Sequence, residues 1–299
     1  MVWPQCRLGV EAGVMKIVIG LPNHIAGVPG PVIGEWVRRA GRRGFAGVGT
    51  IDRLVYPSLD SIVALGIAAG AGADLELVTN ILLAPLYQPT VLAKQLASLA
   101  DVAGDRLVIG VGVGSREDDY AAAGVDFAAR GRILDEQIAI MRRAWRGEPV
   151  ADGTPLCPAP VRIPLLVGGK SNATVRRATT LGDGWVAGAL RDYPDQSAFA
   201  DRIRAGWKEA GRPGDPVIHA SVNFAIGDDD IAQAGREHLG RYYGFNPAYA
   251  QLNVDDMLTD AADARETVRA YRDLGFDRLI FHPTVTSVEQ VDRLADAIL

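Results

Sequence analysis

The sequence has few cysteines and no long apolar segment. Its 299 residues include only two cysteines, Cys6 and Cys157. They are too far apart for a paired metal motif and form no disulfide framework, which favours a reducing cytoplasm. The first 14 residues lack the cationic start and apolar centre of a secretory signal. No run of about 18 apolar residues occurs, so no transmembrane helix is expected. We therefore expect a cytoplasmic protein with no membrane partner.

The sequence also lacks an excess of basic residues. Lysine and arginine number 31, aspartate and glutamate 36, and the two signs are interspersed. Because nucleic-acid binding relies on clustered basic side chains, no nucleic-acid partner is expected. Only four histidines occur, none in an HExxH or similar spacing, and the acidic run 117–119 is typical of a solvated loop. We predict no catalytic metal.

What the sequence does contain is a regular alternation of short apolar runs and helix-period segments. The apolar runs are KIVIGLP from Lys16, FAGVGT from Phe45, LELVTN from Leu75, RLVIGVG from Arg106, PLLVGG from Pro164, GWVAG from Gly184, VIHASVNF from Val217 and RLIFHP from Arg278. Such runs are typical of parallel strands buried on both faces. Eight units of this kind predict a (β/α)8 TIM barrel with insertions at the carboxyl-end loops, where these barrels carry their chemistry. We expect one domain over 15–299, with 1–14 an extension outside the fold and Met15 the natural start.

Segments between the runs carry apolar residues at helical spacing. The expected outer helices cover 31–43, 58–69, 89–100, 131–145, 172–181, 194–210, 263–274 and 287–299. Two connections, 147–163 and 227–260, are longer than a barrel needs. The second contains Tyr242, Tyr243, Phe245 and Tyr249. It is interpreted either as a lid or as a packing or dimer surface.

Two glycine-rich segments follow predicted strands and face the expected pocket. In VGGKSNATVRRA, two glycines leave a strand, a lysine adds positive charge and a serine or asparagine can cap the next helix. This pattern is compatible with a phosphate site and equally with an ordinary helix cap. The other segment, IGVGVGSREDDY, lacks the third glycine of the dinucleotide fingerprint, and about fifteen residues of acidic loop are expected before its helix. We interpret its small residues as backbone against a flat ring or as packing at the barrel rim.

One long stretch resembles a known family. The residues TNILLAPLYQPTVLAKQLASLADVAGDRLVIGVGVGSREDDYAAAGVDFAARGRILDEQIAIMRRAW resemble the core of the bacterial luciferase-like oxidoreductases, which use flavin or deazaflavin. The resemblance runs from Lys16 to about Ala189, includes PLLVGGKSNATVRRATTLGDGW, and resumes at GFDRLIFHP. It implies a barrel that binds FMN or its deazaflavin analogue, coenzyme F420, at the carboxyl ends of the strands.

The resemblance assigns cofactor contacts to several residues. Asp52 matches an acidic residue near the pyrimidine side of the ring. The segment Thr79, Asn80 and Ile81 matches the end of the third strand, where a cis Asn80–Ile81 bond is expected behind the ring. The ring edge matches Gly112, Gly114 and Ser115, and the phosphate end matches Gly168, Gly169, Lys170 and Ser171. Each of these residues could instead be purely structural.

The sequence departs from the family at two positions. Sugar-phosphate and secondary-alcohol dehydrogenases of the family carry a histidine directly after the aspartate, where this sequence has Arg53. They also tend to carry a glutamate at the ring edge, where this sequence has Ser115. Those two activities are therefore doubted. His24, at the end of the first predicted strand, is the weak catalytic candidate, against a hydrogen-bonded loop histidine. His282 is similarly placed, whereas His219 and His238 are interpreted as structural or solvated.

The implied activity is oxidation or reduction of a small organic substrate. With FMN we expect monooxygenation, supported by a separate flavin reductase, and with coenzyme F420 we expect hydride transfer. The resemblance also implies a homodimer. Two alternatives remain: a cofactor-binding or inactive barrel without turnover, and a phosphosugar isomerase or aldolase barrel. The aldolase lacks an obvious buried lysine for a Schiff base.

Overall fold

The computed structural model describes residues 14–72, 74–151, 153–157 and 159–299. Eight parallel strands close into a barrel in the order β1-β10-β9-β8-β7-β4-β3-β2. These strands are β1 Lys16–Gly20, β2 Gly47–Thr50, β3 Glu76–Leu82, β4 Leu107–Val111, β7 Leu165–Gly168, β8 Gly184–Val186, β9 Val217–Phe224 and β10 Arg278–Pro283. The predicted barrel is confirmed, and each strand lies within the apolar run that predicted it or extends it by a residue or two. The expectation for residues 1–14 falls almost wholly outside the described residues.

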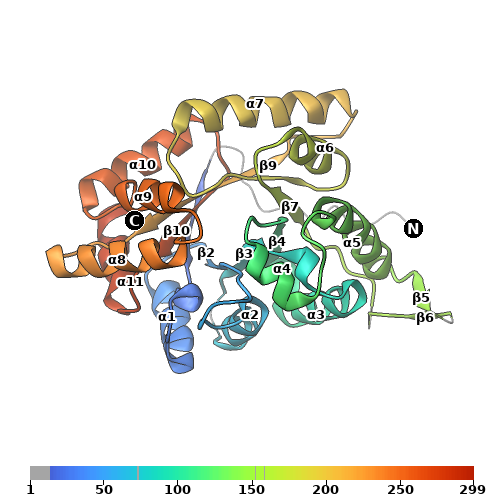
Figure 1. Cartoon of the computed structure of the whole chain (residues 1–299), viewed down its shortest axis with the longest axis horizontal. Helices are drawn as coiled ribbons and strands as arrows, with labels where there is room; N and C mark the ends of the chain where they lie inside the picture. The colour runs from blue at the N-terminus through green and yellow to red at the C-terminus, as the bar shows by residue number, and fades with distance from the viewer. Residues whose placement is uncertain (1–13, 73, 152, 158) are drawn as a thin grey trace.

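Helices surround the barrel strands (Figure 1). They are α1 Gly30–Arg42, α2 Ser61–Gly70, α3 Pro89–Ala103, α4 Glu117–Ala123, α5 Arg130–Trp145, α6 Asn172–Thr180, α7 Tyr193–Glu209, α8 Asp229–Tyr242, α9 Pro247–Asp255, α10 Ala261–Asp273 and α11 Glu289–Ile298. Short 3-10 turns cover Pro22–His24, Ala84–Leu86 and Gly104–Arg106. In the described part of the chain, no helix is both long and apolar enough to cross a membrane.

The two long connections contain regular structure. The first holds a small antiparallel hairpin of β5 Pro149–Ala151 and β6 Thr154–Pro155, which projects beyond α5 at the right of Figure 1. The second holds α8 and α9, which lie together beside β10. The acidic run 117–119 was expected in a solvated loop, and this was wrong. It forms the first turn of α4, where carboxylates are favoured by the helix dipole.

The barrel interior is packed with branched apolar side chains. They are Val18, Val78, Val108, Leu166, Val186, Val217 and Ile280, and Ile81 packs against them. Strand β2 has a glycine, Gly49, beside this cluster, where an added Cβ would lie 3.3 Å from Ile280. A larger core fills the space between strands and helices. Because side chains fill the interior, a ligand must bind above it, at the loops.

Charged groups close the amino-terminal end of the barrel. Arg278 is 1% exposed and donates to both carboxylate oxygens of Glu76, at 2.7 and 2.9 Å. Lys16 donates to the same carboxylate at 2.6 Å, and the His219 ring lies 3.2 Å from the Arg278 guanidinium. His219 is fully buried, so of the two interpretations offered for it, structural or solvated, the structure favours the structural one.

Candidate functional site

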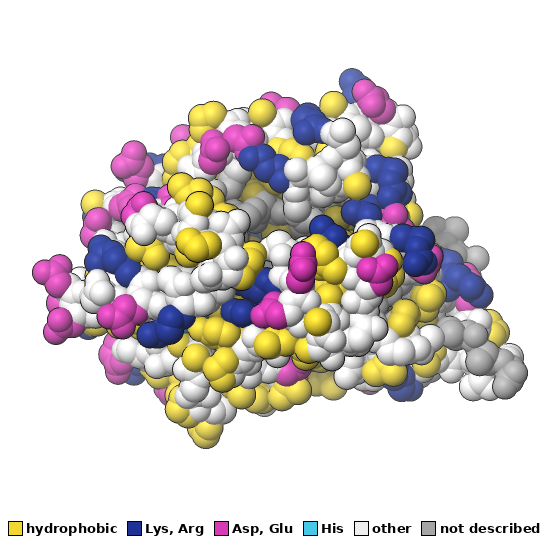
Figure 2. All heavy atoms as spheres, viewed as in Figure 1, with side chains coloured by type: hydrophobic (Ala, Val, Ile, Leu, Met, Phe, Trp, Pro, Cys, Tyr) yellow, Lys and Arg dark blue, Asp and Glu magenta, His cyan; other side chains and the backbone are white. Residues whose placement is uncertain are grey.

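A cavity of about 490 Å³ opens at the carboxyl ends of the strands. Its walls come from the ends of β2, β3, β4, β7, β8, β9 and β10. Residues 242–249, which run from the end of α8 into α9 and are called the α8–α9 segment, complete them. The space-filling view is hollowed near its centre, between the α8–α9 segment and α6 (Figure 2). Loops that follow strands far apart in the sequence meet here because parallel strands of a barrel all end at one face.

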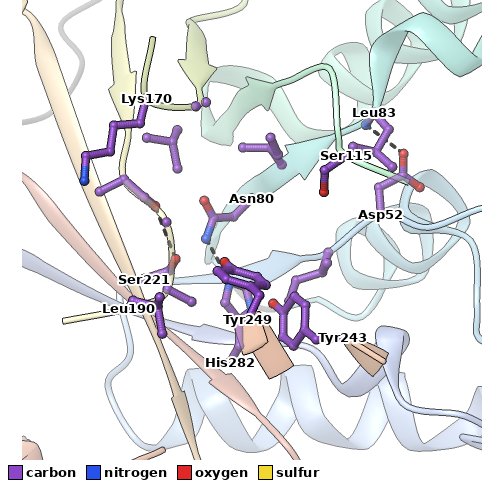
Figure 3. A pocket seen from close by; sticks show the side chains of 18 of the residues that line it. Asp52, Asn80, Leu83, Ser115, Lys170, Leu190, Ser221, Tyr243, Tyr249 and His282 are labelled. Atoms are coloured by element: carbon purple, nitrogen blue, oxygen red, sulfur yellow. Dashed lines mark hydrogen bonds between the residues drawn. The ribbon is translucent and has the colours of Figure 1, made fainter. Parts of the chain in front are cut away.

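The cavity gathers most of the residues that the family resemblance selected. Those that line it are Asp52, Asn80, Ile81, Ser115, Gly168, Gly169 and Lys170. Lys170 lies on the opposite side of the cavity from Asp52 and Ser115 (Figure 3). Thr79, Gly112, Gly114, Ser171 and His24 are not among the lining residues.

Thr79 has a structural environment instead. Its hydroxyl donates to the Gly110 carbonyl at 2.8 Å and accepts from the Gly110 amide at 2.9 Å. Thr79 is fully buried. These two bonds join β3 to β4 just before their register shifts, between Thr79 and Leu82. Thr79 therefore holds the strand end in place behind the cavity.

Asn80 and Ile81 form the floor of the cavity. The peptide bond between them is cis, which confirms that expectation. The Asn80 side-chain amide lies 2.8 Å from Nε2 of His282, and both side chains line the cavity (Figure 3). The Asn80 Oδ1 atom is buried and has no hydrogen-bond partner. A ligand in the cavity could therefore offer a donor to this oxygen.

Two glycines, Gly112 just after β4 and Gly168 at the end of β7, lie against the Ile81 side chain. A Cβ added to Gly112 would lie 2.1 Å from Ile81 Cδ1, and one added to Gly168 would lie 2.7 Å from it. Gly114 has φ +64° and faces Leu83. We interpreted the small residues of this segment as backbone against a flat ring or as packing at the barrel rim. The structure favours packing, because at Gly112 the space is filled by Ile81.

Asp52 is a buried carboxylate on the cavity wall. It accepts hydrogen bonds from the Leu83 amide at 2.9 Å and from the Tyr87 hydroxyl at 3.1 and 3.2 Å. Burial raises the pKa of Asp52 to about 6, although the hydrogen bonds from Leu83 and Tyr87 oppose the shift. Its charge therefore changes close to neutral pH.

The glycine loop after β7 supplies one end of the cavity. Gly169 has φ +112°, a conformation that side chains rarely adopt, and its carbonyl accepts from the Trp185 indole at 2.8 Å. Ser171 caps α6 by accepting from the Thr174 amide, which is the ordinary alternative interpretation of that serine. Lys170 forms an ion pair with Asp195 on the cavity rim. The charge of the lysine is therefore already balanced.

His24 lies behind the cavity wall, in the turn after β1. Its ring makes edge contacts with His238, Tyr242 and His282, at centroid distances of 5.3, 5.8 and 6.0 Å. Burial lowers the pKa of His24 to about 4 and that of His238 to about 2. His238 is 2% exposed, so of the two interpretations offered for it the structure favours the structural one. Of the four histidines, only His282 lines the cavity.

Two arginines attach the α8–α9 segment to the barrel, and sequence reasoning missed this role for both. Arg53 and Arg116 donate to the same carbonyl, that of Tyr242, at 2.9 and 3.1 Å. The Arg53 guanidinium also lies over the Tyr56 ring, 4.4 Å from its centre. Buried Asp119 of α4 accepts from the Val55 amide. The sequence offered only an arginine after each of two predicted strands and a run of aromatics in a distant connection, and nothing in it joins them.

Among the residues that the structure describes, no three His, Cys, Asp or Glu side chains are placed to hold a metal ion. The cavity instead combines glycine backbone, an amide, a carboxylate, a lysine and aromatic rings. Those groups suit an organic ligand with a phosphate.

Comparison with known proteins identifies the family. The model of the luciferase-like monooxygenase family matches residues 15–297. The chain belongs to this family. The family expected from the sequence is thus confirmed.

Individual relatives are more distant. An uncharacterized Mycobacterium tuberculosis protein is 33% identical over 172 residues, 54% of this chain and 59% of that protein. The F420-dependent hydroxymycolic acid dehydrogenase of the same organism is 31% identical over 171 residues, 52% of this chain and 46% of the enzyme. These similarities span about half of each relative. An F420-dependent secondary alcohol dehydrogenase, solved with an F420-acetone adduct, shares the fold at a TM-score of 0.79 and 19% identity, with 95% of this chain and 98% of that chain covered.

Proposed function

We propose that the protein is a deazaflavin-dependent oxidoreductase, which passes a hydride between coenzyme F420 and a small organic substrate. Membership of the luciferase-like family supports a redox function, and the F420-dependent mycobacterial relative supports the deazaflavin. The observation that carries the proposal is a single cavity that joins the Asn80–Ile81 floor to the Gly168–Lys170 loop. Such a cavity can hold a flat ring at one end and a phosphate at the other.

The residues present fit this cofactor. The unpartnered Asn80 oxygen and the Asp52 carboxyl would face polar atoms of a ring above the floor. The Gly168–Lys170 loop leads directly into the amino terminus of α6, where free amides and the helix dipole favour a phosphate. Lys170 would hold that phosphate in competition with Asp195.

The bound cofactor would supply the hydride acceptor or donor, and the protein would orient the reactants. Asp52 is the group on the cavity wall that could take up or release a proton near neutral pH, because burial brings its pKa to about 6. Leu83 and Tyr87 hold the Asp52 carboxyl in one orientation. The aromatic side chains of the α8–α9 segment would limit the access of water.

A parallel fluorescence titration with FMN and coenzyme F420 tests the proposal. We expect binding of F420 at least tenfold tighter than that of FMN. Tight binding of FMN alone would replace the proposal with FMN-dependent monooxygenation. Binding of neither cofactor would contradict a redox function and favour a barrel without turnover.

Two substitutions that change the local charge in opposite directions test the phosphate end of the cavity. Lys170 and Asp195 are 54% and 40% exposed, so changing either should leave the fold intact. Lys170→Met should weaken F420 binding about fivefold, and Asp195→Asn should strengthen it by a similar factor, because one exposed charge near a helix terminus contributes up to about 1 kcal/mol. Lys208→Met, at an exposed lysine on α7, is the control. If Lys170→Met and Asp195→Asn both bind like wild type, the phosphate does not lie at this loop.

A further inference from the structure

Two basic side chains line the cavity among the described residues, and they differ in their partners. Lys170 is paired with Asp195 at one end. Arg116 has no described carboxylate within ion-pair distance, although it belongs to a chain rich in ion pairs. One Arg116 nitrogen donates to the Tyr242 carbonyl at 3.1 Å, and its Nε is buried without a hydrogen-bond partner. Arg116 therefore brings a positive charge to the cavity wall that no carboxylate of the described chain balances.

Flat apolar surfaces surround this charge. The Arg116 guanidinium carbon lies 4.6 Å from the centre of the Tyr242 ring and 4.5 Å from that of Phe245. Tyr243 and Tyr249 meet edge to face, with centroids 5.1 Å apart, and both point into the cavity on the same side (Figure 3). A ligand next to Arg116 would thus meet aromatic faces rather than polar groups.

The attachment of the α8–α9 segment does not account for the charge of Arg116. Arg53 already donates to the Tyr242 carbonyl at 2.9 Å, and its guanidinium also lies over the Tyr242 ring. Arg53 has a carboxylate partner as well, Asp118 at 3.7 Å, and it does not line the cavity. A second cation on the same carbonyl would pay a desolvation cost with no ion pair to offset it.

We propose that Arg116 binds the carboxylate of the substrate, whose flat apolar or aromatic body packs against Tyr243 and Tyr249. This inference rests on the proposed function, because it assigns the substrate class of the same cavity. A guanidinium with spare donors matches a carboxylate better than any neutral group, and a charge-assisted hydrogen bond in a partly buried site is strong. The substrate end would lie by Ser115, the neighbour of Arg116 in the sequence, which is across the cavity from Lys170 and the phosphate end (Figure 3).

The test compares two probes of equal shape and different charge. The F420-loaded protein is titrated calorimetrically with 3-phenylpropionate and with 3-phenylpropanamide. Wild type should bind the acid at least tenfold more tightly than the amide, since a hydrogen bond between two charged groups is stronger than one from a guanidinium to a neutral amide. Arg116→Met should lose this preference without changing the affinity for the amide, and Arg116→Lys should keep part of it. Equal binding of acid and amide by wild type would overturn the proposal.

Arg53→Gln is the matched control. It removes the other donor to the Tyr242 carbonyl but alters no side chain that lines the cavity. The preference for the acid should survive in this variant. If Arg53→Gln loses the preference as fully as Arg116→Met, the position of the α8–α9 segment matters and the charge of Arg116 does not, which overturns the inference.

A separate titration with coenzyme F420 distinguishes this inference from the proposed function. Arg116→Met should bind F420 like wild type. A loss of at least tenfold in F420 affinity would place Arg116 at the cofactor and refute its role in substrate binding. If wild type binds no F420, the proposed function fails, and the same comparison of acid and amide on the protein alone still decides whether Arg116 selects a carboxylate.

Discussion

Replacing Gly112 with alanine should force Ile81 out of its place in the cavity floor. The new Cβ would lie 2.1 Å from Ile81 Cδ1, far closer than atoms in contact can approach. Overpacking of this kind typically costs about 1–3 kcal/mol of folding free energy. The variant should also bind cofactor more weakly, because Ile81 lines the cavity.

A second substitution isolates this steric effect. Ile81→Val removes Cδ1, and the next atom of Ile81 lies 3.4 Å from the Gly112 Cβ position, an ordinary contact. The Gly112→Ala/Ile81→Val protein should therefore be about as stable as Ile81→Val alone. A double-mutant cycle should therefore give a coupling free energy of about 1–3 kcal/mol, the whole cost of Gly112→Ala in wild type. Urea unfolding of all four proteins, with cofactor titration beside it, measures both consequences.

Gly110→Ala is the matched control for this cycle. Its added Cβ would lie 2.7 Å from the Thr79 carbonyl oxygen, which Ile81→Val leaves in place. Rescue by Ile81→Val should therefore be weak at position 110. If the effects of Gly112→Ala and Ile81→Val add to within about 0.5 kcal/mol, the two residues are not in steric conflict and the account of the cavity floor is wrong.

Two further predictions concern buried charge. The folded-state pKa of His24, about 4, lies below its ordinary 6.5, so the unfolded chain binds more protons and stability falls as pH falls from 6.5 towards 4. Between pH 7 and pH 4.5, the free energy of unfolding of His24→Phe should fall by about 2–3 kcal/mol less than that of wild type, as measured by urea unfolding. If both proteins show the same pH dependence, His24 can be protonated in the folded state and the reasoning is wrong. Glu76→Gln should destabilise the protein by about 3–5 kcal/mol because it leaves Arg278 buried without its carboxylate. Glu136→Gln, which breaks an exposed pair with Arg132, should cost less than about 1 kcal/mol, and equal midpoints for the two variants would contradict the assignment.

The barrel and the location of the site at the carboxyl ends of the strands could be predicted from the sequence, because both depend on local pattern. A continuous apolar run such as that of β7 is typical of a strand buried on both faces in a covered parallel sheet. The residue that ends each run must then lie at one face of the barrel. Asn80, Lys170 and Asp52 were selected in this way, with the family resemblance, and all three line the cavity.

The partners of these residues could not be predicted, since they come from distant parts of the chain. Asp195 neutralises Lys170 from α7, and Ile81 occupies the space that Gly112 leaves on the next strand. His24 follows the first strand as the pattern required, but its ring packs behind Tyr242 and His282, which line the cavity in its place. A strand-end position therefore fixes the location of a residue's backbone, but it does not decide which groups the side chain contacts.

The sequence by itself determined the eight-unit barrel, the family and the loops that carry the site, because apolar periodicity and glycine spacing act over a few residues. Only the tertiary structure decided which side chains share the cavity. Arg53 and Arg116 stand on different loops, yet both reach the Tyr242 carbonyl of the α8–α9 segment. Such long-range contacts depend on how the loops pack over the barrel, and the free charge of Arg116 became visible only there.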